Sequence, residues 1–187
     1  MKLTDLPGLR KRSSHLPPVP SQADFAGLVE RYQGPLFGFL GRMGFGQAEA
    51  EDLAQNTFLR AWQSLGQFNQ TRGAFSTWLF AIARNLAIDE RHRSGRQPEA
   101  MDGAAPDDTA SPQAGPEELL ARARQHRRVH AALLQLAVAD RCVLALAYIA
   151  ELDMDSIARI EGCTVGAVKT RLHRARQRLF ELLATPL

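Results

Sequence analysis

Hydrophobic residues recur at intervals of three and four along most of the chain, the period of an amphipathic α-helix. The first run extends from Phe25 to Met43 and contains Gly34-Pro35, where we expect a kink or a break. Further helices are expected over 48–65 and 75–93, each with one apolar face. The glycines and polar residues of 66–74 between them predict a loop. The pattern therefore predicts an all-α fold.

The faces opposite the apolar stripes are polar in both of these helices. The third helix should bury a stripe made of Phe75, Leu79, Ile82 and Leu86. Its other side carries Thr77, Arg84, Ile88 and Arg91. In the second helix the face away from the core carries Asp52, Gln55, Asn56, Leu59 and Gln63. A polar helix face is usually just solvated, so spacing alone favours solvent over a partner site here.

Composition divides the chain into an arm, a helical block, a tether and a second helical block. Residues 1–22 combine basic side chains with prolines, among them Pro17, Pro18 and Pro20, and predict a flexible arm. Residues 95–116 contain four prolines, three glycines and acids without aromatic residues, a composition that predicts a flexible linker. The expected domains are therefore 23–94 and 117–187.

The second block ends in the pattern of a helix-turn-helix. Apolar residues from Glu117 to Ala150 predict one or two helices with a break near Asp140. A short helix over 154–161 should point its isoleucines inward, and a helix starting at Val165 follows a tight turn. We expect Gly162 to supply the conformational freedom of that turn and Thr164 to cap the next helix.

The last helix is strongly basic. From Val165 to Phe180 there are five basic side chains and no acid. Arg171, Arg174 and Arg178 recur on the side opposite the apolar stripe, which suits a helix inserted into the major groove of DNA. A solvated basic helix is the alternative, but the short preceding helix and the turn favour DNA. Nucleic acid is the first candidate partner.

Other classes of function find little support in the sequence. The two cysteines lie far apart without a CxxC pair, so neither a disulfide framework nor a cysteine zinc site is expected. His126 and His130 have the i, i+4 spacing of histidine pairs that bind zinc on a helix, but the sequence shows no third ligand, so a structural or solvated role is favoured. No arrangement of nucleophile, acid and base stands out, and no apolar run is long enough to span a bilayer. We expect a cytoplasmic protein with no enzymatic activity, no cofactor, no metal and no small-molecule substrate.

Two stretches together resemble the extracytoplasmic-function (ECF) group of bacterial RNA polymerase sigma factors. The first runs from Glu49 to Trp62, EAEDLAQNTFLRAW, and continues from Phe75 to Asp89, FSTWLFAIARNLAID. The second runs from Val165 to Arg176, VGAVKTRLHRAR. The resemblance covers nearly everything from Phe25 to Leu183 except the linker. It implies a sigma-2-like bundle followed by a sigma-4-like helix-turn-helix.

The resemblance also implies roles for residues of the first domain. In this family the second helix docks on core RNA polymerase, which implicates Asp52, Leu53, Gln55 and Phe58, although the spacing of Phe58 suggests core. The loop and the third helix capture the melted minus-ten element of promoter DNA. The candidates for that contact are Asn69, Arg72, Thr77, Arg84, Asn85 and Arg91. Trp78 invites a stacking role, but its place beside a leucine stripe favours core.

In the second domain the family's recognition helix enters the minus-thirty-five element. Matching positions are Lys169, Thr170, Arg171, His173, Arg174 and Arg176, and helical projection adds Arg178. The family's frequent Leu-Pro before the third helix of this domain is replaced by Ala137-Val138-Ala139, which puts a helix boundary in doubt. The implied function is promoter-specific transcription initiation, with core RNA polymerase, promoter DNA and an anti-sigma factor as partners. The alternative is a helix-turn-helix regulator that acts without polymerase.

Overall fold

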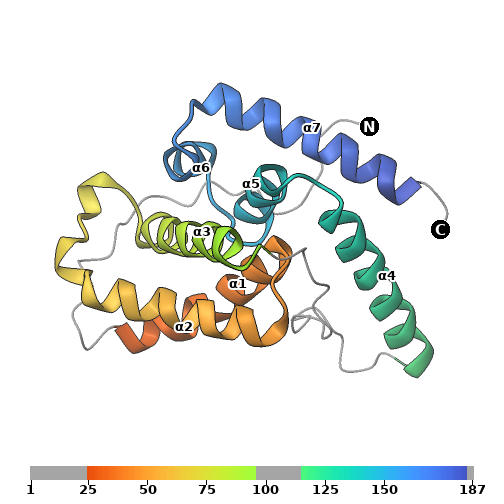
Figure 1. Cartoon of the computed structure of the whole chain (residues 1–187), viewed down its shortest axis with the longest axis horizontal. Helices are drawn as coiled ribbons and strands as arrows, with labels where there is room; N and C mark the ends of the chain where they lie inside the picture. Colours follow the sequence, from red (N-terminus) through yellow and green to blue (C-terminus); the bar gives the residue numbers. More distant parts are fainter. Residues whose placement is uncertain (1–24, 96–114, 185–187) are drawn as a thin grey trace.

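The computed structural model describes residues 25–95 and 115–184, and this part of the chain is helical with no β-strand (Figure 1). Its α-helices are α1 (Phe25–Met43), α2 (Gln47–Gln63), α3 (Phe75–Ser94), α4 (Pro116–Leu134), α5 (Val138–Tyr148), α6 (Met154–Glu161) and α7 (Val165–Ala184). The loop before α3 contains the 3-10 turns η2 (Leu65–Gln67) and η3 (Gln70–Arg72). The all-α prediction is confirmed. The expected arm and nearly all of the expected linker lie outside the described residues.

Helix α1 continues through Pro35, so of the kink or break expected there the break is excluded. A proline removes one backbone hydrogen bond, but the following turn holds the helix in place. Leu36, Phe39 and Leu40 on that turn are completely buried. The helix ends where the glycines predict, because Gly44 adopts a φ of 92°, a left-handed conformation that side-chain-bearing residues rarely adopt.

The break in the second block lies earlier than expected. Helix α4 ends at Leu134, and the chain turns where the amides of Gln135 and Leu136 donate to the carbonyls one turn earlier. Asp140 lies in the first turn of α5, where its negative charge faces the positive end of the helix dipole. Two helices are therefore present as expected, the break between them lies a few residues before Asp140, and the acid marks a helix start.

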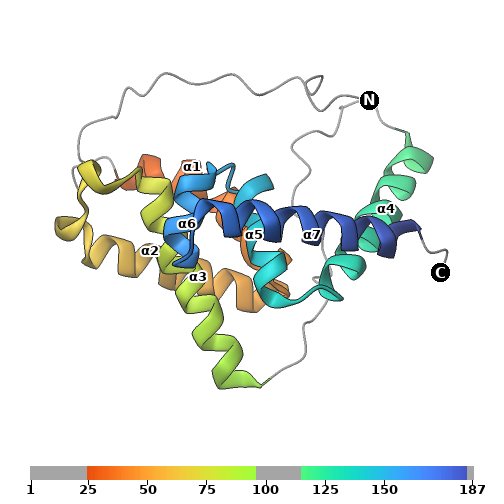
Figure 2. The ribbon, with the colours of Figure 1, turned by 90° about the horizontal axis from the view of Figure 1, so that it is seen from above.

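The two blocks pack directly on each other. Helices α1, α2 and α3 form one group; α5 lies against α1, and α6 lies against α3. Helix α7 crosses above α5 and α6, and the amino-terminal half of α4 projects away from the rest (Figures 1 and 2). One apolar cluster includes Phe39 and Phe80 from the first block with Val143 and Ile157 from the second. The two expected helical blocks are present, and they share this core.

A second, smaller cluster lies at the other end of the first block. It joins Phe25 with Phe68, Phe75 and Leu79, and aromatic rings pack edge to face within it. The ring of Trp78 lies 5.3 Å from that of Phe68, between ring centroids. Its half-buried position in this cluster favours the structural interpretation of Trp78.

Candidate nucleic-acid interface

The helix-turn-helix is held by local hydrogen bonds at both of its helix starts. At the start of α6, a carboxylate oxygen of Asp153 accepts from the amide of Ser156 at 2.7 Å. The helix ends at Gly162, whose φ is 63°, and Thr164 Oγ1 accepts from the amide of Ala167 at 3.2 Å. The roles expected of Gly162 and Thr164 are confirmed. Both isoleucines of α6 are buried, as expected.

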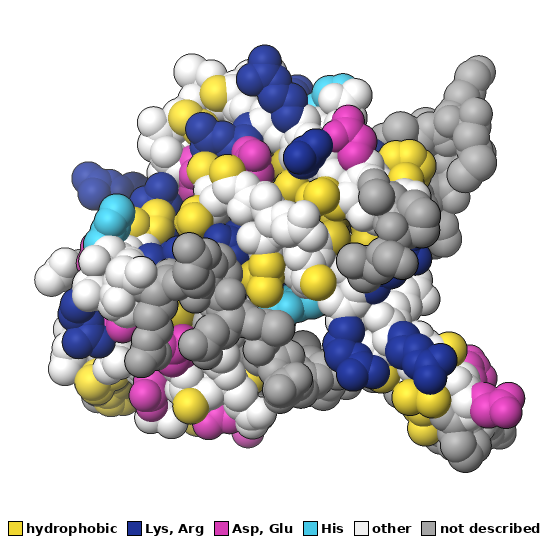
Figure 3. Space-filling view, turned by 45° about the vertical axis from the view of Figure 1, so that its right-hand side comes forward, with side chains coloured by type: hydrophobic (Ala, Val, Ile, Leu, Met, Phe, Trp, Pro, Cys, Tyr) yellow, Lys and Arg dark blue, Asp and Glu magenta, His cyan; other side chains and the backbone are white. Residues whose placement is uncertain are grey.

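Helix α7 buries one side and presents the other to solvent. Val168, Leu172 and Ala175 are buried, on the stripe that the sequence predicts. The exposed candidates for recognition are Lys169, Thr170, His173, Arg174, Arg176 and Arg178. Figure 3 shows dark blue basic side chains over the upper part of the molecule, where α7 lies in Figure 1. This exposed face has the charge and shape required to meet DNA phosphates and base edges.

Arg171 differs from the other basic residues of α7. Its side chain is 36% exposed, and its Nη1 lies 3.3 Å from a carboxylate oxygen of Glu161. Arg178 is also paired, with Glu181 at 3.1 Å, but both of those side chains are largely exposed and belong to one helix. Arg171 is therefore held by a buried acid of α6, whereas the other basic side chains of α7 are exposed.

The loop before α3 places two of the minus-ten candidates at its surface. Asn69 accepts through its Oδ1 from both the amide and the hydroxyl of Thr71, which closes the turn η3. Arg72 is exposed, and its backbone carbonyl accepts a hydrogen bond from Arg159 Nη1 at 2.7 Å. Gly73 follows in a conformation with φ of 155° that favours glycine.

Three of the four candidates on α3 contact other parts of the chain, whereas Asn85 is exposed. Thr77 is 8% exposed, and its hydroxyl lies 2.9 Å from that of Ser156 on α6. Arg84 contacts Glu161 and also Asn85, and Arg91 donates to the carbonyl of Met43 at 2.8 Å. The face that carries Thr77 and Arg84 is therefore covered by the second block.

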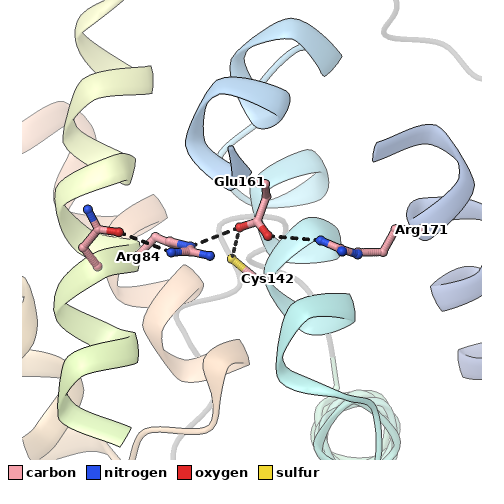
Figure 4. A network of polar contacts seen from close by, with 5 residues as sticks. Arg84, Cys142, Glu161 and Arg171 are labelled. Carbon is pink, nitrogen blue, oxygen red and sulfur yellow. Dashed lines mark hydrogen bonds and ion pairs between the residues drawn. The ribbon is translucent and has the colours of Figure 1, made fainter. Parts of the chain in front are cut away.

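A network around Glu161 brings the two expected DNA-binding helices together (Figure 4). Its Oε1 lies 3.2 Å from Nε of Arg84 on α3 and 3.3 Å from Sγ of Cys142 on α5, and its Oε2 faces Arg171 on α7. The carboxylate side chain is only 3% exposed. Burial, followed by the charge of Glu161 and the hydrogen bond to it, raises the pKa of the Cys142 thiol, which stays protonated and donates.

Three arginines lie near the end of α1. Arg42 donates to the carbonyl of Gly38, and burial lowers the pKa of both Arg42 and Arg91. Arg141 is 2% exposed, and its Nε and Nη1 have no hydrogen-bond partner. Burial, with a smaller contribution from the charge of Arg91, lowers the pKa of Arg141 to about 10, so the group remains charged at neutral pH.

The outer face of α2 is exposed as the sequence predicts. Asp52 and Gln55 are exposed, whereas Leu53 is buried and Phe58 is half-buried against the core. A groove between α2 and α3 is lined by Glu49, Asp52, Leu53, Asn56, Glu90, Arg93 and Ser94. Asp52 and Gln55 can contact a partner directly, and Leu53 and Phe58 support the helix from below.

The interior contacts between the blocks are what the sequence analysis missed. Glu161, Ser156 and Arg159 were not singled out, and they contact Arg84, Thr77 and Arg72. A signal was present in α3, where Phe80, Ala83 and Ala87 recur outside the predicted stripe and are completely buried. A helix with two apolar stripes needs two packing partners.

Metal and membrane sites find no support in the described residues. No group of three or more His, Cys, Asp or Glu side chains there is placed to hold a metal ion. His130 instead lies with its Nε2 3.1 Å from the carbonyl of Gly41, a structural contact. Over the same described ranges, no helix is long and apolar enough to cross a membrane.

Comparison with known families finds two matches in chain order. Residues 28–97 match Sigma-70 region 2, and residues 126–179 match Sigma-70 region 4. The first match covers the α1–α3 group, and the second contains the helix-turn-helix.

Characterised relatives are similar over most of their length. The ECF sigma factor SigW of Bacillus subtilis is 33% identical, over 87% of this chain and 90% of its own. The sigma-H factor of Pseudomonas aeruginosa is 34% identical, over 83% of this chain and 84% of its own.

Two solved structures share the fold. RpoE of Bartonella quintana, solved in complex with the anti-sigma factor NepR, superposes with a TM-score of 0.70 at 25% identity, over 88% of this chain and 99% of its own. CnrH, solved with the cytosolic domain of CnrY, gives a TM-score of 0.65 at 28% identity, over 87% of this chain and 89% of its own. In both, the similarity spans both helical groups.

Proposed function

The chain belongs to the extracytoplasmic-function (ECF) group of RNA polymerase sigma factors, and we propose that its two helical regions read the two elements of a promoter for the polymerase that it joins. Region 2 would comprise residues 23–94, region 4 residues 117–187, and 95–116 the linker between them. The observation that carries this proposal is a helix-turn-helix with an open basic face, in one chain with a region 2 match.

Region 4 would read the minus-thirty-five element with the open face of α7. Lys169, Thr170, His173, Arg174 and Arg176 are exposed on one helix whose other side is packed, which leaves them free to enter a major groove. Arginines on such a helix bind guanine edges or backbone phosphates. Arg171 and Arg178 would join them once released from their carboxylate partners.

Region 2 would serve both polymerase docking and the minus-ten element. The exposed Asp52 and Gln55 present an acceptor and an amide on a helix held from below by Leu53 and Phe58. Asn69 and Arg72 on the loop, with Thr77, Arg84, Asn85 and Arg91 on α3, would contact the melted strand. Holding an unpaired strand requires positive charge along its backbone and a pocket for an unstacked base.

Partners and place in the cell follow from the same proposal. The chain would act on core RNA polymerase and promoter DNA in the cytoplasm, without catalysis of its own, because bond formation belongs to the polymerase. An anti-sigma factor is a further expected partner, since RpoE of Bartonella quintana was solved with one. The alternative, a regulator that acts without polymerase, does not account for the region 2 match or for the exposed polar face of α2.

In vitro transcription tests the proposal directly. Purified chain, core RNA polymerase and fragmented genomic DNA should yield transcripts whose start points share two upstream elements. Absence of transcripts from every fragment, with a folded chain, would contradict the proposal.

Asp52→Ala tests the docking surface. Loss of one charged hydrogen bond should weaken association with core polymerase about tenfold. The matched control is Glu51→Ala, because Glu51 is an exposed acid on the neighbouring position that bonds only within α2, to Gln47 at 3.1 Å. Association is measured by a fluorescence binding titration, and circular dichroism checks that α2 is intact. Equal affinities for Asp52→Ala and Glu51→Ala would remove Asp52 from the docking surface.

A further inference from the structure

Glu161 connects region 2 to region 4 through a single buried carboxylate. Arg84 on α3 belongs to region 2, whereas Glu161 and Arg171 belong to region 4. The carboxylate thus occupies one basic residue from each of the two surfaces expected to meet DNA (Figure 4). Because the Glu161 side chain is 3% exposed, water screens these ion pairs less than it does a surface pair.

Helix α6 covers further parts of the minus-ten surface. Ser156 bonds the hydroxyl of Thr77, and Arg159 donates to the carbonyl of Arg72. Ile157, between them on α6, is completely buried in the shared core. A DNA strand cannot reach Thr77 while α6 is in place, so this arrangement and strand capture by α3 exclude each other.

The same interface contains a group that opposes it. Arg141 on α5 is buried with two N–H groups unpartnered, and its charge lies near that of Arg91 on α3. A buried and unpaired cation destabilises the state that buries it. Glu161 and the shared core therefore stabilise the closed arrangement, and Arg141 destabilises it. An interface with both kinds of group can separate at a modest cost in free energy.

We infer that this chain has an autoinhibited closed state in which Glu161 latches the helix-turn-helix onto α3 and covers the minus-ten surface. The inference rests on the proposed function, because it assigns the covered residues a role in DNA binding. Release separates α6 from α3, frees Arg84 and Arg171 together, and so couples the availability of the two promoter surfaces. The latch acts by occupying these groups and needs no added ligand.

Distance measurement on the free, full chain tests the latch. Spin labels at cysteines introduced at the exposed Gln33 on α1 and Gln177 on α7 report the separation of the two regions. Cys163 is replaced by serine, and the buried Cys142 is kept. This labelled protein with Glu161 intact is the parent, and it should give one short distance by double electron–electron resonance.

Glu161→Gln should increase the population at longer distances at least threefold, because the amide keeps the shape of the side chain and loses its charge. The matched control, Glu181→Gln, removes an acid from the exposed pair with Arg178 inside α7 and should leave the distances unchanged. Identical distances in Glu161→Gln and the parent would overturn the latch. A parent that already shows mainly long distances would overturn the closed state.

A reversible crosslink tests inhibition even if Glu161→Gln folds poorly. The hydroxyl oxygens of Thr77 and Ser156 are 2.9 Å apart, so cysteines at both positions lie within reach of a disulfide. In the Cys163→Ser background, the oxidised double variant should initiate transcription at least tenfold less than the same protein after reduction. Equal activity of the crosslinked and reduced forms would overturn autoinhibition.

These readouts separate the inference from the proposed function. The distances are measured without polymerase, so they report the latch whether or not the chain initiates transcription. If the unmodified chain does not initiate transcription with core polymerase, the proposed function is contradicted. The closed state is then judged from the distances alone.

Discussion

The outer face of α7 and the corresponding face of α3 differ in what lies against them. Both carry arginines at helical spacing and both are expected to meet promoter DNA. On α7, Arg174 and Arg176 are exposed, whereas on α3 the neighbours of Arg84 and Thr77 are side chains of α6. A polar helix face therefore need not face solvent, because its side chains can pair with a buried carboxylate on another helix.

The comparison also separates two kinds of charged contact. The pair between Arg178 and Glu181 is exposed on both sides and contributes little to stability, about 0–1 kcal/mol. Glu161 is buried and pairs with two partly buried arginines from different helices, so removal of its charge leaves both of them without this partner. Position in the fold, rather than residue type, decides which contact controls the conformation.

The largest expected effect tests whether the covered face belongs to a shared core. Ile157→Ala removes a completely buried side chain of region 4 and should lower the free energy of unfolding by about 2–5 kcal/mol. Because both tryptophans lie in region 2, their fluorescence during urea denaturation reports the other side of the contact. A tryptophan transition unchanged from wild type, with helicity lost earlier, would mean that the regions unfold independently.

A smaller and opposite effect is expected from Arg141→Met. The substitution keeps an extended side chain and removes the unpaired buried charge, so the free energy of unfolding should rise by about 1–3 kcal/mol. Since burial holds the pKa of Arg141 at about 10, below its value in the unfolded chain, the penalty is fully present at neutral pH and decreases as the pH rises through 10.

Urea denaturation at pH 7 measures the effect of Arg141→Met. Arg124→Met is the control, because Arg124 is exposed on α4 and should change stability very little. Stabilisation by both variants alike would assign the gain to the methionine rather than to the removed buried charge.

The local sequence pattern was sufficient to predict helix faces that are either buried in the core or exposed to solvent. The apolar stripe of α7, the turn at Gly162 and the cap at Thr164 follow from rules that act within a few residues. The same rules identified Asp52 and Gln55 as exposed. The open parts of the candidate site could therefore be predicted from the sequence.

Contacts between distant segments were beyond the reach of that pattern. Pro35 suggested a break in α1, but burial of Leu36 and Phe39 on the next turn maintains the helix. Glu161 looked like an ordinary acid at the end of a short helix, and its role depends on Arg84, 77 positions away in the chain. Charge pairing of this kind has no sequence period, so it required the fold.

The smallest expected effect tests whether the exposed face of α7 contacts promoter DNA. Arg174→Ala should weaken binding of the polymerase-bound chain to promoter DNA about fivefold, because one exposed guanidinium that meets a phosphate is lost. The slope of log affinity against log salt should fall by about one unit. Fluorescence anisotropy with labelled promoter DNA at several salt concentrations gives both values.

Arg124→Ala controls for general loss of positive charge, since Arg124 is exposed on α4, outside the helix-turn-helix. The control should leave the salt slope unchanged, because only a charge that neutralises a phosphate releases a counterion. If Arg174→Ala and Arg124→Ala behave alike, the open face of α7 does not meet the DNA backbone at Arg174. A loss of affinity with an unchanged slope would instead place Arg174 on a base edge, where its bond specifies sequence.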